Sequence, residues 1–253
     1  MMLQHSTRIT TVALLRRLAA GIALLLGSMG GVRHCIANDT WGGSVGITSD
    51  YVVRGITRTE NRPALQLDFH YLTSSGFVAG IFASNTQFDP VDRRDVELNA
   101  FLGFAWRPAN DWRGRILAAH YSYPWNQSGS QYNYDELTLE LGYQDWLNVS
   151  LAYSPNSPHI LSGGDYRSVA AESVELNLQR PILGKLLGTA GVGYYYLGGT
   201  DGTGYTYWSL GVAYEFAPLS LTVAYIGTSD AANSLFYNAA VSGRWTGTVI
   251  WRF

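Results

Sequence analysis

The sequence predicts an all-β protein: a transmembrane antiparallel up-and-down β-barrel of about twelve strands, preceded by an N-terminal signal peptide. Three observations predict this fold. Extended segments alternate between apolar and polar side chains, and their connections alternate between short and long. Charged residues make up only 14% of the chain, yet no apolar run long enough for a helical span follows the N-terminus. A closed barrel is the remaining way to cross a membrane.

The first residues have the features of a secretory signal. Three arginines precede an apolar run at 18–26, and small residues ending at Ala37 suit a signal peptidase. We therefore predict a signal peptide at 1–37 and a mature barrel at 38–253. The single cysteine, Cys35, would leave with the signal, which excludes a disulfide in the mature chain. Signal removal lowers the basic residues from 17 to 13 against 19 acidic ones, a net charge of −6, and no basic patch indicates nucleic-acid binding.

Twelve segments of the mature chain have the period of two that is typical of strands. We place them at 41–54, 64–72, 77–85, 95–107, 112–123, 134–144, 146–153, 169–179, 186–197, 206–216, 219–227 and 241–253. Alternation is clearest at 206–216 and at 134–144. It is weakest at 77–85, which is apolar on both faces.

The last segment has an aromatic face opposite a polar one and ends the chain on Phe253. Trp245 and Trp251 share the apolar face, whereas Arg244 and Thr248 take the other. This pattern is typical of the closing strand of an outer-membrane barrel, and we expect the barrel-assembly machinery to read Phe253. A globular edge strand would alternate in the same way.

The connections supply an independent signal. Short ones fall at 74–76, 108–111, 145, 181–185 and 217–218, and long ones at 55–63, 86–94, 124–133, 154–168, 198–205 and 228–240. Short turns on the side of the termini predict an outer-membrane topology with periplasmic termini and an even number of strands. Ten or fourteen strands are alternatives. A secreted soluble sandwich is another, but Trp and Tyr at both ends of strands suit the membrane interfaces better than a dry core.

A run at 49–85 carries a family resemblance. Its pattern consists of Ser49, Tyr51, Arg54 and Gly55, then Pro63 and Gln66, then Gly80, Ser84 and Asn85. The run resembles the TorF family, a proteobacterial outer-membrane family whose members are named as porins, and the similarity extends over essentially the mature chain. It implies a porin of a Gram-negative bacterium. The C-terminal Trp-Arg-Phe departs from the lysine-containing ending of that family but keeps the terminal Phe.

A catalytic role would require a nucleophile paired with a base. We expect His70 and His120 to face the lumen and His159 to lie in a long loop, away from any lipid-facing nucleophile. The mature chain has no Gly-x-Ser-x-Gly elbow, zinc-ligand spacing or phosphate-binding loop. We therefore predict no catalytic, cofactor-binding or metal-binding residue, and no enzyme.

Charged residues on the polar faces are the candidate lumen residues. They are Asp50, Arg54, Asp68, His70, Glu97, Glu136, Glu140, Glu175 and Arg244. We expect Arg54 and Arg244 near the mouth on the long-connection side and the carboxylates deeper. Carboxylates in a narrow lumen predict a channel for small solutes with a modest cation preference, in contact outside with outer-membrane lipid and lipopolysaccharide. Alternatively, the arginines pair with carboxylates to plug a closed barrel that has a structural, adhesive or partner-binding role.

Overall fold

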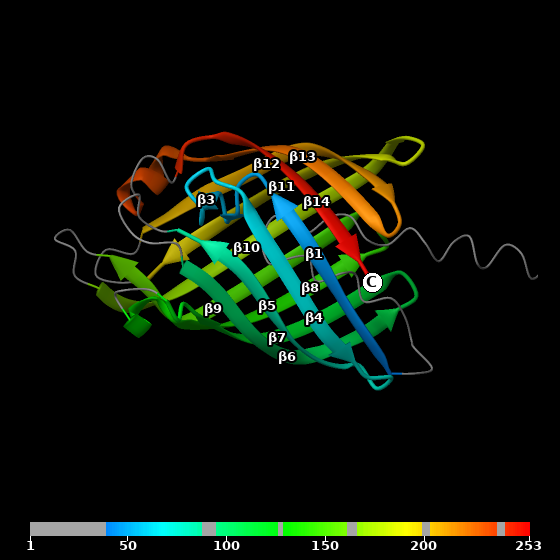
Figure 1. Cartoon of the computed structure of the whole chain (residues 1–253), viewed down its shortest axis with the longest axis horizontal. Helices are drawn as coiled ribbons and strands as arrows, with labels where there is room; N and C mark the ends of the chain where they lie inside the picture. The colour runs from blue at the N-terminus through cyan, green and yellow to red at the C-terminus, as the bar shows by residue number, and fades with distance from the viewer. Residues whose placement is uncertain (1–38, 88–94, 126–128, 161–165, 199–202, 237–240) are drawn as a thin grey trace, which may run out of the picture.

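Twelve antiparallel strands form a closed barrel (Figure 1). The computed structural model describes residues 39–87, 95–125, 129–160, 166–198, 203–236 and 241–253. Each strand of the wall pairs with its neighbours in the chain, and β1 (Thr40–Thr48) closes the barrel by pairing with β14 (Arg244–Arg252). The predicted fold class and strand count are confirmed. The predicted signal peptide at 1–37 lies outside the described residues.

The bounds of the other wall strands follow the predicted segments closely at most positions. They are β4 (Ala64–Leu72), β5 (Phe77–Thr86), β6 (Asp95–Ala109), β7 (Trp112–Ser122), β8 (Tyr134–Tyr143), β9 (Leu147–Ile160), β10 (Tyr166–Leu183), β11 (Leu186–Leu197), β12 (Thr203–Phe216) and β13 (Leu219–Thr228). Two short 3₁₀ helices lie in the connections, η2 (Gly129–Tyr132) and η3 (Asp230–Ser234). The described helices are all too short and too polar to cross a membrane.

One end of the barrel, which we call the termini end, carries Asp39, Phe253 and the short turns; the opposite end, the long-connection end, carries the long connections (Figure 1). The predicted long connection at 154–168 is wrong, because β9 and β10 continue as a paired hairpin in which Tyr166 faces Ile160. His159 therefore lies on a strand. Parts of the other long connections, 88–94, 126–128, 199–202 and 237–240, lie outside the described residues.

The wall separates an apolar outside from a polar inside. Leu102, Leu210 and Trp245 are more than 60% exposed on the outer face, although they are large hydrophobic side chains. The side chains that alternate with them point inward and are mostly polar or small, as the period of two predicts. An outward apolar surface around a polar interior is the arrangement of a transmembrane barrel.

The predicted first strand, 41–54, is wrong beyond Thr48. From Asp50 to Thr59 the chain turns into the barrel and forms a small hairpin of β2 (Val52–Val53) and β3 (Ile56–Thr57), which we call the inner hairpin. Its two turn residues, Arg54 and Gly55, have φ angles of 50° and 80°. Two successive positive φ angles are typical of the tight type I′ turn, so the chain reverses where the sequence pattern suggested a continuous strand.

Candidate functional site in the barrel lumen

The inner hairpin is fixed in the lumen by hydrogen bonds around Asp50. The Asp50 carboxylate accepts hydrogen bonds from the hydroxyls of Thr57 and Thr59, and Thr48 donates to the Asp50 carbonyl at 2.8 Å. The backbone N–H of Gln87 donates to a carbonyl of the hairpin at 2.7 Å. The hairpin is therefore joined to the wall at its base and is not a free loop.

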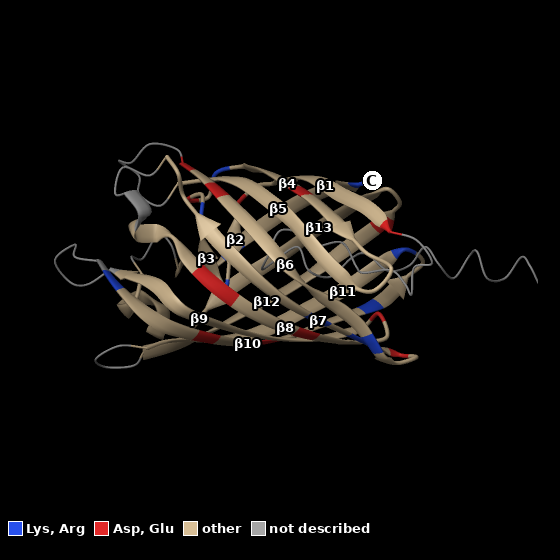
Figure 2. Cartoon of the chain, turned by 90° about the horizontal axis from the view of Figure 1, so that it is seen from below, with Lys and Arg blue, Asp and Glu red and all other residues tan. Residues whose placement is uncertain are grey.

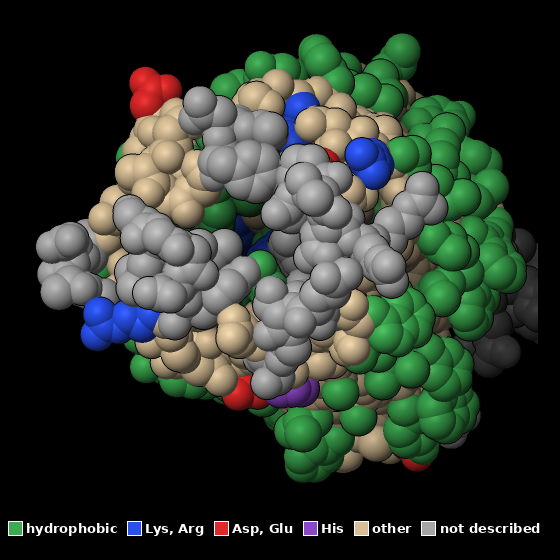
Figure 3. Space-filling view, turned by 60° about the vertical axis from the view of Figure 1, so that its left-hand side comes forward, with side chains coloured by type: hydrophobic (Ala, Val, Ile, Leu, Met, Phe, Trp, Pro, Cys, Tyr) green, Lys and Arg blue, Asp and Glu red, His purple; other side chains and the backbone are tan. Residues whose placement is uncertain are grey.

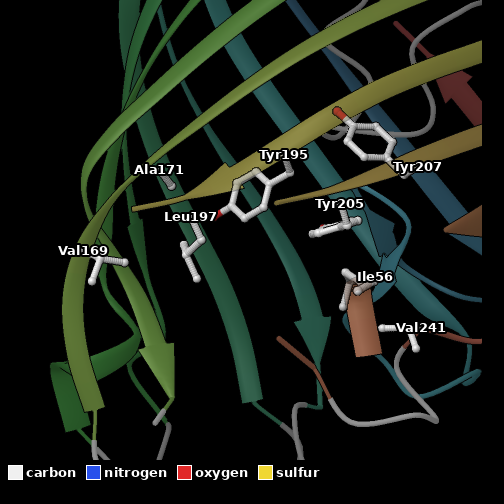
Figure 4. Close-up of a cluster of buried hydrophobic side chains, with 9 residues drawn as sticks. Ile56, Val169, Ala171, Tyr195, Leu197, Tyr205, Tyr207 and Val241 are labelled. Carbon is white, nitrogen blue, oxygen red and sulfur yellow. The ribbon is translucent and has the colours of Figure 1, made fainter. Parts of the chain in front are cut away.

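Apolar side chains of the hairpin pack against both sides of the lumen. Figure 4 shows Ile56 and Val241 near Tyr205 and Tyr207, in the buried cluster that fills the β11–β12 side. On the opposite side, Val53 lies in a second buried cluster made with Tyr51, Ala64 and Phe82. Because the hairpin contributes to both clusters, it fills the long-connection end of the lumen as a small core.

Three ion pairs lie inside the barrel. They are Arg54–Glu136 at 2.8 Å, Arg244–Asp50 at 2.9 Å and Arg115–Glu140 at 2.6 Å. Their side chains are 13% exposed or less. Charges removed from water to this degree are tolerated when they are paired and hydrogen-bonded, and removing one partner is costly.

The remaining candidate carboxylates are held by neutral partners or by histidine. Glu97 accepts hydrogen bonds from the hydroxyls of Tyr51 at 2.9 Å and Tyr123 at 2.7 Å. Glu175 accepts one from Tyr207 at 2.9 Å. The remaining two candidates, Asp68 and His70, contact each other at 2.7 Å. All nine candidate residues thus point into the barrel interior. However, Asp50 and Arg54 lie on the inner hairpin and not on the first strand as predicted.

Sequence reasoning missed two arginines that lie beside the candidate carboxylates. Arg115 pairs with Glu140, and the alternation of β7 could have identified it, because the outward Ile116 follows it and the inward Leu117 comes next. Arg58 lies on the inner hairpin and donates its backbone N–H to the Tyr51 carbonyl. No sequence signal indicated it, because the hairpin itself was not predicted.

A polar cavity remains along β8, β9 and β10. It is lined by Arg54, Glu136, Thr138, Glu140, Asn148, Ser150, Ala152, Ser173, Glu175 and Asn177, and we call it the acidic cavity. Figure 2 shows that acidic positions occur along the strands, whereas basic positions lie mostly toward the two ends of the barrel. On the other side of the lumen, Leu72, Val78, Phe101 and Leu117 form an inward apolar cluster. Polar space also occurs between β1, β4, β13 and β14, where a separate cavity is lined by Thr48, Gln66, Thr222, Thr246 and Thr248 among others.

Figure 3 shows the long-connection end, where basic side-chain atoms are visible inside a hollow of the surface. A second, tighter space, with no room for a water molecule, lies beneath this end, between the inner hairpin and the walls of β6, β7 and β8. Its lining residues are Tyr51, Val53, Arg54, Glu97, Tyr121, Tyr134 and Glu136. We call it the tyrosine cavity. Among the described lining residues, only Arg54 and Glu136 are common to this cavity and the acidic cavity.

The prediction that His120 faces the lumen is wrong. His120 lies on the outer face of β7, 54% exposed, and contacts Asp135 at 2.8 Å. Asn156 donates to the same carboxylate at 2.9 Å. Ser122, on the same face of β7, donates to the Leu98 carbonyl rather than to His120.

Comparisons with solved structures show the fold of outer-membrane porins. The KdgM porin is 13% identical, with a TM-score of 0.51, and the similarity covers 84% of this chain and 99% of that one. The NanC porin is 11% identical, with a TM-score of 0.52 and coverage of 84% and 99%. At these identities the likeness is one of fold. No curated protein matches the chain. A family model described as a bacterial protein of unknown function (Gcw_chp) matches residues 36–251, and the chain belongs to this family.

Proposed function

We propose that the protein is a narrow outer-membrane channel for passive diffusion of small solutes, with a modest cation preference. The acidic cavity is the observation that carries the proposal, because nine of its ten lining residues are polar or charged. A polar interior inside an apolar outer wall suits water and solutes rather than lipid. The porin fold and the resemblance to TorF family porins support the same function.

The charge balance of the lumen supports the cation preference. The candidate set contains six carboxylates and two arginines, Arg54 and Arg244, and two further arginines, Arg58 and Arg115, lie beside this set. The carboxylates therefore outnumber the guanidinium groups. Carboxylates that line a narrow, low-dielectric passage attract cations and repel anions.

The reversal potential under a salt gradient tests the preference. The parent protein in a planar bilayer should favour cations, and changing Asp68, Glu140 and Glu175 together to Asn, Gln and Gln should weaken that preference. Glu172→Gln is the matched control, because Glu172 points outward on β10. Anion preference in the parent protein, or an unchanged potential in the triple variant, would contradict it.

The proposed location is the outer membrane of a Gram-negative bacterium, with periplasmic termini and with lipid and lipopolysaccharide around the wall. We propose that the barrel-assembly machinery reads Phe253, whose ring is 59% exposed beside Trp251. Deleting Phe253 should reduce membrane insertion far more than deleting the connection residue Asn233. The protein should fractionate with outer membranes and change its gel mobility on boiling; recovery as a soluble periplasmic protein would reject this location.

A closed barrel with a structural, adhesive or partner-binding role is the second candidate. The observation in its favour is the inner hairpin, which joins two buried clusters and two ion pairs inside the lumen. A folded, heat-modifiable protein that conducts no ions in a bilayer would favour this role over the channel.

A further inference from the structure

We infer that Arg54 determines the ion selectivity of the lumen, by extending from the tip of the inner hairpin across the passage to Glu136. The inference rests on the proposed channel function. It assigns to one residue of the inner hairpin the charge that solutes meet beside the acidic cavity.

Arg54 lies where the acidic cavity and the tyrosine cavity meet. The acidic cavity and the tyrosine cavity share Arg54 and Glu136 among their lining residues, and the ion pair between these residues is 2.8 Å long. A solute moving between the cavities must therefore pass this pair or displace it. The Arg54 side chain is 13% exposed and that of Glu136 is 3% exposed, so little water surrounds the contact.

The hairpin tip is pressed against the wall on one side of the lumen. A Cβ atom at Gly55 would lie 2.5 Å from Cγ2 of Thr228 and 2.9 Å from Cβ of Tyr207, so only glycine fits there. The Tyr205 hydroxyl donates to the Arg54 carbonyl at 2.9 Å. These contacts hold the backbone of the tip beside β12 and β13, whereas Glu136 lies on β8. The Arg54 side chain consequently bridges separate parts of the wall.

The backbone of Arg54 is unusual for this residue type. Its φ angle of 50° lies in the left-handed region, where asparagine or glycine is favoured over a residue with a long side chain. The guanidinium carbon also lies 5.2 Å from the centre of the Tyr195 ring, so the ring stabilises the cation by a cation–π interaction. A strained residue that makes specific charged contacts in a passage points to a role beyond the turn itself.

The charge of Arg54 opposes the charge of the acidic cavity. Three carboxylates, Glu136, Glu140 and Glu175, line this cavity, and Arg54 is the only arginine among its lining residues. Removing the Arg54 charge makes the passage more negative, whereas removing the Glu136 charge leaves Arg54 without its partner carboxylate. The two changes should therefore shift selectivity in opposite directions.

The test is the conductance and reversal potential of the mature protein in planar bilayers. Arg54→Asn shortens the side chain, removes its charge and suits the type I′ turn, so the hairpin should keep its fold. We expect several-fold higher conductance and stronger cation preference. Glu136→Gln should shift the reversal potential toward anions, and Arg54→Lys should keep the parent selectivity. Arg62→Asn is the control for the loss of an arginine, because Arg62 is exposed and lines neither the acidic cavity nor the tyrosine cavity.

Four outcomes decide the inference. Opposite shifts for Arg54→Asn and Glu136→Gln support it, and so does a silent parent protein that conducts once Arg54 is changed. A conducting parent whose values are unchanged in Arg54→Asn overturns the inference and leaves the channel function intact. Folded, heat-modifiable proteins that are silent in every variant overturn the channel function and the inference together.

Discussion

The inner hairpin and the acidic cavity occupy the same lumen but are built in opposite ways. Around the hairpin, Val53 and Ile56 are buried among tyrosines and two ion pairs join the hairpin to the wall. Along β8–β10 the cavity is lined by small polar side chains such as Ser150 and Ser173. An eight-stranded barrel fills with its own side chains and a sixteen-stranded one leaves a channel. In this barrel of intermediate size, an extra segment closes one region and small residues keep another open.

Removing the inner hairpin should have the largest effect. If residues 50–60 are replaced by a short Gly-Ser link, the two buried clusters lose their central side chains and the lumen opens at the long-connection end. We expect a conductance increase larger than that of Arg54→Asn, measured by single-channel recording. Retained heat-dependent gel mobility is the control for folding. An unchanged conductance would show that the hairpin does not limit the passage.

The ion pairs at the two ends of the barrel should differ strongly in their contribution to stability. Arg244→Gln leaves the Asp50 carboxylate, only 3% exposed, without its cation, which should cost about 3–5 kcal/mol. Arg113→Gln breaks a pair with Asp145 that is 30% and 47% exposed at the termini end, which should cost about 0–1 kcal/mol. Urea unfolding of the refolded barrel in lipid vesicles measures both. Equal losses of unfolding free energy in the two variants would contradict the distinction between the two ends.

Gly55 and Gly247 provide a matched pair of glycines. Gly55→Ala places a Cβ at a positive φ and against Thr228, which should destabilise the hairpin by at least about 1–2 kcal/mol and raise the conductance. At Gly247 on β14 nothing lies within 4 Å of an added Cβ, so alanine should change stability by about 0.5 kcal/mol or less. Urea unfolding in lipid vesicles measures the change in stability of both variants, and single-channel recording measures their conductance. A Gly55→Ala variant with unchanged stability and conductance would mean that the turn tolerates a side chain.

The wall was predictable from the sequence because the barrel imposes one physical rule on every strand. Side chains must alternate between lipid and lumen, so segments such as 206–216 indicate both their structure and their inward residues. The inner hairpin is not bound by this alternation. Val52 and Val53 are adjacent and both buried, because a segment inside the lumen has no lipid face, and the sequence pattern therefore merged them with the first strand.

The candidate site was predictable as a set of residues but not as a set of contacts. Alternation selects Glu140 and Glu175, since their neighbours are apolar and point outward, and it selects Glu136 through the outward leucine that follows it. Which arginine each carboxylate contacts depends on side chains that meet across the lumen, such as Arg54 and Glu136, 82 residues apart in the chain. The register of β7 brings Arg115 beside Glu140, and sequence spacing alone does not specify that register.

The smallest expected effect concerns Asp39, an exposed carboxylate at the termini end that contrasts with the buried carboxylate of Asp50. Hydrogen bonds from the Tyr71 hydroxyl and the Ser74 backbone N–H lower the pKa of Asp39 below its ordinary value of 3.8. A depressed pKa in the folded state stabilises the fold above the unfolded pKa, and this stabilisation is lost as the pH falls through the folded pKa. Asp39→Asn should therefore lower stability slightly at pH 7 and by less at a lower pH, because the advantage of the parent carboxylate is lost as the pH falls through its folded pKa. Tyr71→Phe should reproduce part of this loss and add little to it in the double variant. Unfolding midpoints at the two pH values measure the effect, and a loss as large as that of Arg244→Gln would contradict the contrast between an exposed and a buried carboxylate.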